Sequence, residues 1–83
     1  MKYEIRKIDA WRNEEGGWTW NDSRKIGEFK TNATDQKRAF LYALHKMGIV
    51  LKRGKFTIDE SNDIYEVQER RTQEPILAAI PIN

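Results

Sequence analysis

Six cationic side chains lie within residues 36–55, and this segment contains no acidic residue. The only histidine of the chain, His45, belongs to the same segment. Cations that are grouped without carboxylates attract anions, and the phosphates of nucleic acid are one such target. The segment therefore predicts a set of nucleic-acid-binding residues: Lys37, Arg38, Lys46, Lys52, Arg53 and Lys55.

A tyrosine stands among these cations. Arg38, Tyr42 and His45 recur at spacings of four and three residues, with Lys46 beside them, so on a helix they share one face. A tyrosine between basic residues is typical of interface anchors, and it could also stack on a base while its neighbours contact phosphates. The alternative is an ordinary solvated helix face.

All three tryptophans fall within the stretch "AWRNEEGGWTWNDS", residues 10–23. Trp18 and Trp20 alternate with Thr19 and so share one strand face, and Trp11 lies across the Gly-Gly turn from them. One interpretation is a cluster of all three that adds bulk to a small core. The other makes Trp18 and Trp20 a contact surface for a partner, because a turn rich in glutamate and glycine offers few apolar neighbours. We expect at least one of the three to be substantially exposed.

The residues needed for most enzyme chemistry are missing from the sequence. His45 is the only candidate base, and neither Ser23 nor Ser61 lies in a recognisable nucleophile turn. The sequence "RGK" at residues 53–55 lacks the surrounding pattern of a phosphate-binding glycine loop. A single histidine without cysteine does not make a zinc site. We therefore expect no catalysis, no cofactor and no bound metal.

An acidic turn is the nearest approach to a cation site. Asp59, Glu60 and Asp63 are close together, but a calcium loop that began at Asp59 would need glycine at its sixth position and glutamate at its twelfth. The chain has Ile64 and Arg70 there. A solvated hairpin turn is the better interpretation.

Charge is distributed unevenly along the 83 residues. Residues 1–57 carry 13 Lys and Arg against 7 Asp and Glu, a net charge of +6, whereas residues 58–83 carry 2 against 6, a net charge of −4. The length predicts a single domain over residues 1–83. The absence of cysteine, and of any signal peptide or apolar span, favours a cytoplasmic protein that does not enter membranes.

Alternating apolar residues predict strands on both sides of one helix. Residues 2–11 form a strand in which a bulge near residues 6–7 keeps Ile8 on the apolar side with Tyr3 and Ile5. The hairpin partner begins at residue 18, has a local turn or bulge at residues 21–23, and continues over residues 24–30. Three later strands follow residue 55, and Pro75 and Pro81 indicate that the last one is an edge strand.

Residues 34–47 have the helical pattern. Thr34 is the expected N-cap, Gly48 follows the C-terminus, and the apolar stripe is Phe40, Ala43, Leu44 and Met47. The order β-β-α-β-β-β predicts an α+β fold, an antiparallel sheet with one helix packed across one face.

The opening pattern "KYEIRKIDAWRNEEGGWTWNDS…GEF", within residues 2–29, resembles the starts of small uncharacterised proteins of phages and mobile elements of Gram-positive bacteria. This resemblance implies a factor that acts by binding, such as a host-takeover or counter-defence protein, or a small DNA-associated protein. The run "FKT" at residues 29–31, before the helix, is similar to the DNA-binding arm domains of phage integrases.

Two functions follow from these observations. The first is a non-catalytic binding module of phage or mobile-element type whose partner is a protein or a protein–nucleic-acid complex. It would use Arg38, Tyr42, His45, Lys46, Trp18 and Trp20. The second is direct nucleic-acid binding through residues 36–55, which the modest net charge of +2 favours less.

Overall fold

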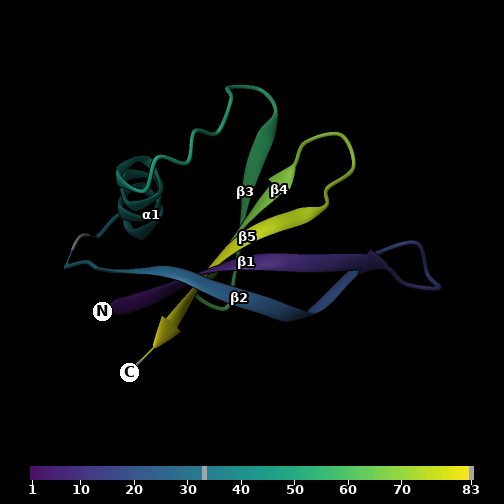
Figure 1. Ribbon diagram of the computed structural model, residues 1–83, viewed down its shortest axis with the longest axis horizontal. Coiled ribbons are helices and arrows are strands. Elements are labelled where there is room, and N and C mark those ends of the chain that lie inside the picture. Colours follow the sequence, from purple (N-terminus) through teal and green to yellow (C-terminus); the bar gives the residue numbers. More distant parts are fainter. Residues whose placement is uncertain (33, 83) are drawn as a thin grey trace.

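Five strands and one helix make up the fold (Figure 1). The computed structural model describes residues 1–32 and 34–82. The elements are β1 (Lys2–Arg12), β2 (Trp18–Lys30), α1 (Gln36–Lys46), β3 (Phe56–Ser61), β4 (Ile64–Glu69) and β5 (Pro75–Ile82). This order confirms the predicted α+β class and the β-β-α-β-β-β sequence of elements.

The strands form one antiparallel sheet in the order β2-β1-β5-β4-β3. The prediction of β5 as an edge strand is wrong, because β5 lies at the centre, between β1 and β4. Its prolines are tolerated for local reasons. Pro75 is the first residue of the strand, and Pro81 pairs with Tyr3 of β1 beyond the last pair with β4, Tyr65 with Ala79. At that point a proline removes no hydrogen bond to β4.

The core lies between α1 and one face of the sheet. Phe40 and Leu44 of α1 are almost fully buried there against Tyr3, Ile5 and Val67, as the predicted stripe requires. The aromatic rings order this core: Tyr3 stacks on Phe29 at 5.0 Å between centroids, and Phe29 stacks on Phe40 at 6.0 Å. Stacked aromatic rings thus attach the helix chiefly to the β1–β2 side of the core.

Gln36 joins the start of the helix to two buried phenols. Its Oε1 accepts hydrogen bonds from Tyr3 Oη at 2.6 Å and from Tyr65 Oη at 3.3 Å. Burial, reinforced by the charges of Glu60 and Asp63, raises the pKa of both tyrosines above the ordinary value near 10. The phenols therefore stay protonated and keep donating to Gln36.

The helix begins one residue later than expected. Asp35, rather than Thr34, is the N-cap, and its carboxylate accepts from the amide N–H of Arg38 at 3.0 Å. Gly48 follows the C-cap Met47 with φ of +79°, a conformation that favours glycine. Met47 belongs to the predicted apolar stripe, but it is 38% exposed because it packs at the rim, over Gly27 of β2.

The first bulge lies in β2 and not in β1. Ile5 pairs with Gly27 and Arg6 with Lys25, so Ile26 is the extra residue, whereas the pairing of β1 with β5 continues unbroken to Lys7. Strict alternation in β1 then puts Ile8 on the face opposite the helix, with Arg6. The prediction that Ile8 joins Tyr3 and Ile5 is wrong for this reason.

Candidate nucleic-acid interface

Two loops that are distant in the sequence meet at one end of the sheet. The first is the turn at residues 52–55, which leads into β3, and the second is the turn between β4 and β5 at residues 70–73. The amide of Arg70 donates to the carbonyl of Lys55 at 2.9 Å and joins them. Figure 1 shows both loops at the same end of the sheet, beside one another.

Each loop is held by its own backbone. Lys55 N–H donates to Lys52 O at 3.1 Å, and Gly54 adopts φ of +80° inside this turn. In the second loop Gln73 N–H donates to Glu69 O at 2.7 Å, and Glu69 N–H donates to Glu74 O at 2.9 Å. The side chains between these bonds are thus free to point into solvent while the backbone is fixed.

Five cations surround a surface cleft of about 440 Å³ between the loops. Glu69 is the one carboxylate among the residues that line the cleft, and Phe56 contributes the apolar surface. All five cations are exposed. We call this group the basic loop cluster: Lys52, Arg53, Lys55, Arg70 and Arg71.

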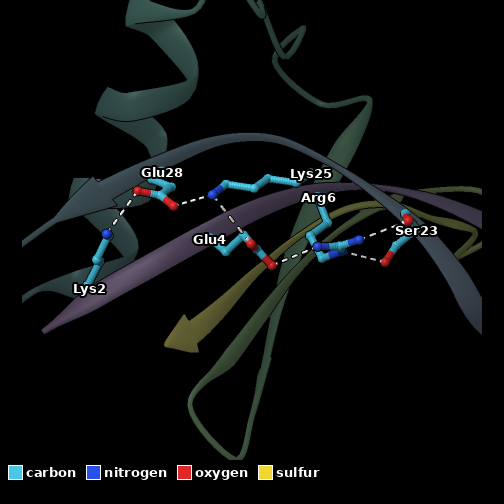
Figure 2. A network of polar contacts seen from close by, with 6 residues as sticks. All are labelled: Lys2, Glu4, Arg6, Ser23, Lys25 and Glu28. Carbon is cyan, nitrogen blue, oxygen red and sulfur yellow. Dashed lines mark hydrogen bonds and ion pairs between the residues drawn. The ribbon is translucent and has the colours of Figure 1, made fainter. Parts of the chain in front are cut away.

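Three cations on β1 and β2, Lys2, Arg6 and Lys25, are paired with carboxylates (Figure 2). Arg6 contacts Glu4 at 2.7 Å and donates from Nε to Ser23 Oγ at 2.5 Å. Lys25 bridges Glu4, at 3.6 Å, and Glu28. Lys2 reaches Glu28 at 3.1 Å. We call these six residues the β1–β2 ion network.

The carboxylate of Glu28 is the centre of this network. Hydrogen bonds from Lys25 and then from Lys2 hold its pKa below the ordinary range. The hydrogen bond to Glu28 correspondingly raises the pKa of Lys25. Among the side chains that the structure describes, every ion pair belongs to this network and none to the basic loop cluster.

The structure divides the predicted nucleic-acid set. Lys52, Arg53 and Lys55 come together in the basic loop cluster. Lys46 lines a different groove, and the first helical turn carries Lys37 and Arg38, both exposed. Segment 36–55 is therefore not one continuous surface.

Sequence reasoning missed Arg70 and Arg71. They lie within residues 58–83, where six acidic residues outnumber two basic ones. Two adjacent arginines in a polar turn were the sequence feature that could have indicated an anion-binding site. The pairing of β3 with β4 sets Phe56 opposite Glu69, and only this pairing shows that the turn at residues 52–55 lies beside the two arginines.

The outer helix row is exposed as predicted. Tyr42 is 61% exposed, and Lys46 Nζ lies 5.1 Å from the centre of its ring. Both line a groove of about 360 Å³ between α1 and β2 that also includes Lys30 and Met47. His45 lines another hollow, with Val50, on the far side of the helix C-terminus. The row is thus divided between two surfaces.

The tryptophans do not form one cluster. Trp11 pairs with Thr19 and so lies on the face opposite Trp18, with 45% of its surface exposed. Trp18 and Trp20 are partly buried and line one cleft of about 270 Å³. The expectation of an exposed tryptophan is met by Trp11, the one that was not assigned to the contact surface.

Metal-binding groups and membrane-spanning helices are absent from the described part of the chain. The described histidine, aspartate and glutamate side chains form no group of three or more that is placed to hold a metal ion. No helix within residues 1–32 and 34–82 is long and apolar enough to cross a membrane.

Comparisons with protein-family models, with curated proteins and with solved structures found no match to this chain.

Proposed function

We propose that this protein binds nucleic acid through the basic loop cluster. The observation that carries the proposal is the convergence of five exposed cations from two loops, with one carboxylate among them and no ion pair to a described side chain. Like charges held together without partners repel one another, so the arrangement favours an anionic ligand. A phosphate backbone supplies several anionic groups at once.

The loop geometry supports a chain of phosphates better than a single small anion. Cations are supplied from both sides of the cleft, by Lys52 to Lys55 on one side and by Arg70 and Arg71 on the other. Arginine forms paired hydrogen bonds to phosphate, whereas lysine acts as a mobile point charge. Backbone hydrogen bonds fix the spacing of the loops before any ligand arrives.

The salt dependence of binding tests the proposal. If all five cations contact phosphates of duplex DNA, the log–log slope of affinity against salt should reach about −4.5, at roughly −0.9 for each contact. Fluorescence anisotropy of labelled DNA at rising salt measures this slope. The double variant Arg53→Gln/Arg71→Gln should bind more weakly and lower the magnitude of the slope by about 1.8.

The matched control is Lys2→Gln/Lys25→Gln. It removes the same formal charge, but from the β1–β2 ion network, and Lys25 lies on β2, at the sheet edge opposite β3. We expect the slope of the control to equal that of the wild type. Absence of binding at low salt, or an equal loss in both double variants, would contradict the proposal.

A protein partner is the second candidate, and the groove beside Tyr42 favours it. Tyr42 is the most exposed aromatic residue in the described part of the chain, and Lys46 and Met47 line the same groove. Tyrosine is enriched among residues that dominate binding energy at interfaces. Tyr42→Ala should then abolish capture of a partner while leaving the salt slope of nucleic-acid binding unchanged.

A further inference from the structure

The cleft of Trp18 and Trp20 borders the basic loop cluster. Arg71 lines the cleft between the two basic loops. The next residue, Thr72, lines the cleft of Trp18 and Trp20, which we call the tryptophan cleft. The indole Nε1 of Trp18 donates to the carbonyl of Thr72 at 2.8 Å, although the two residues are 54 positions apart. This bond attaches the end of the β1–β2 hairpin to the β4–β5 turn. One ligand can therefore contact both clefts.

The tryptophan cleft offers two indole rings to a ligand. Two indoles from alternate strand residues line it, and its volume of about 270 Å³ is just below the range of about 300–1,000 Å³ that is typical of small-molecule pockets. The guanidinium of Arg12 lies 4.2 Å from the centre of the Trp18 ring and donates from Nη1 to Gly16 O at 2.6 Å. This contact fixes the Trp18 ring before a ligand binds.

The polar residues of the cleft suit the edge of a base. Glu66 and Gln68 project from β4 into it, and Gln68 Nε2 contacts Glu66 Oε1 at 3.4 Å. Carboxylate and amide side chains pair with the exocyclic amino groups and ring nitrogens of bases. The charges of Arg12 and Glu66 offset each other here, whereas the basic loop cluster holds five cations against one carboxylate. Phosphates are therefore drawn to the loops and the uncharged base is left for the tryptophans.

We propose that the ligand is single-stranded nucleic acid, with its phosphates on the basic loop cluster and one unpaired base stacked in the cleft of Trp18 and Trp20. This inference rests on the proposed function and narrows it to one substrate class. The bases of a duplex are stacked and paired, so a duplex can reach the loops but cannot place a base in the cleft. Stacking on aromatic side chains tolerates any base, which predicts little sequence preference.

The test compares labelled oligothymidine with a DNA duplex of equal length, in the wild type and in Trp20→Leu. Trp20 is chosen because the N–H of Trp18 also holds Thr72. We expect the wild type to bind the single strand more tightly. Trp20→Leu should lose about tenfold in affinity for the single strand and keep its affinity for the duplex.

Two further variants distinguish the loss of base stacking from a general loss of folded structure. Trp20→Phe retains a stacking ring and should recover most of the preference for the single strand. Trp11→Leu changes an equally large residue on the opposite face and should bind both ligands as the wild type does. Quenching of tryptophan fluorescence by the oligonucleotide should persist in Trp11→Leu and decrease in Trp20→Leu.

The outcomes separate this inference from the proposed function. Equal affinity for both ligands, weakened by Arg53→Gln/Arg71→Gln but not by Trp20→Leu, would overturn the inference and leave the proposed function standing. Failure to bind either ligand at low salt would overturn both.

Discussion

Cations are paired with carboxylates in the β1–β2 ion network, whereas in the basic loop cluster they pair with no described side chain. In the network, Lys2, Arg6 and Lys25 are each within ion-pair distance of Glu4 or Glu28, on the paired strands β1 and β2. In the loops, five cations converge around a single carboxylate and pair with no described side chain. Charges that the fold pairs contribute to its own stability, and charges that it leaves unpaired raise the local potential for a ligand.

Backbone geometry explains the difference. Glu4 and Glu28 face each other across β1 and β2, and Lys2 and Lys25 lie close enough to these two carboxylates to pair with them. The loops instead use their hydrogen bonds to fix the main chain, at Lys55 and Arg70, and leave the side chains to solvent.

The largest effect is expected for Phe40→Ala. This change removes the ring that stacks on Phe29, the residue of β2 that follows Glu28 of the network. Phe40 is fully buried, and its loss should lower the free energy of unfolding by about 3–5 kcal/mol. Chemical denaturation measures this value. Leu41→Ala, on the same helix but at a 38% exposed position, should cost about 1 kcal/mol or less. Equal losses in the two variants would show that the helix packs by a different face.

Gly54→Ala should have the next largest effect, and it acts on the loops alone. Gly54 has φ of +80° and no atom within 4 Å of an added Cβ, so the cost of about 1–2 kcal/mol is one of backbone conformation. Affinity for nucleic acid should fall as the 52–55 turn relaxes. Gly54→Asn should lose less in both measurements, because asparagine tolerates positive φ. An equal loss in both variants would exclude φ as the cause.

Single charge removals should change stability in opposite directions in the two regions. Glu28→Gln leaves Lys2 and Lys25 with a weaker partner and should lower the melting temperature. Arg70→Gln relieves repulsion in the basic loop cluster and should leave the melting temperature unchanged or raise it. Thermal denaturation at low and high salt measures both shifts, which should shrink as salt screens the charges. Destabilisation by both variants would show that the loop cations are paired in solution.

The smallest effect is the response of the network to acid. Because the pKa of Glu28 is lowered in the folded protein, its stabilising contribution is complete above the ordinary glutamate pKa of about 4.3 and is lost as pH falls through the lowered value. Melting temperature measured from about pH 5 to pH 2 should therefore fall less steeply in Glu28→Gln than in the wild type. Parallel curves of melting temperature against pH for the two proteins would show that the ion pairs of Glu28 do not stabilise the fold.

Local patterns in the sequence were sufficient to predict most of the elements. Alternation predicted the strands, the spacing of Phe40 and Leu44 predicted the buried helix face, and Gly48 marked the helix end. The N-cap was misplaced by one residue, because Thr34 and Asp35 are both good caps and the choice depends on which side chain reaches the amide of Arg38. Such signals act within one turn of chain, where few competing contacts intervene.

Strand order and face were decided by the tertiary structure. Nothing local distinguishes a central strand with proline at its first and penultimate positions from an edge strand, and β5 is central because β1 and β4 both pair with it. The sequence of one strand is equally unable to show which of two paired strands contains the extra residue of a bulge. The extra residue proved to be Ile26 of β2, and that choice put Ile8 on the face opposite the helix.

The candidate site shows the same division. Composition alone marked Lys52, Arg53 and Lys55 as cations without nearby acids, and alternation alone put Trp18 and Trp20 on one face. The addition of Arg70 and Arg71, and the separation of Lys46 from the loop cations, required the pairing of β3 with β4 and the packing of α1 on the sheet. Residue type and spacing determine what chemistry a segment can offer. Only long-range strand pairing, stabilised by burial of the core, decides which segments share a surface.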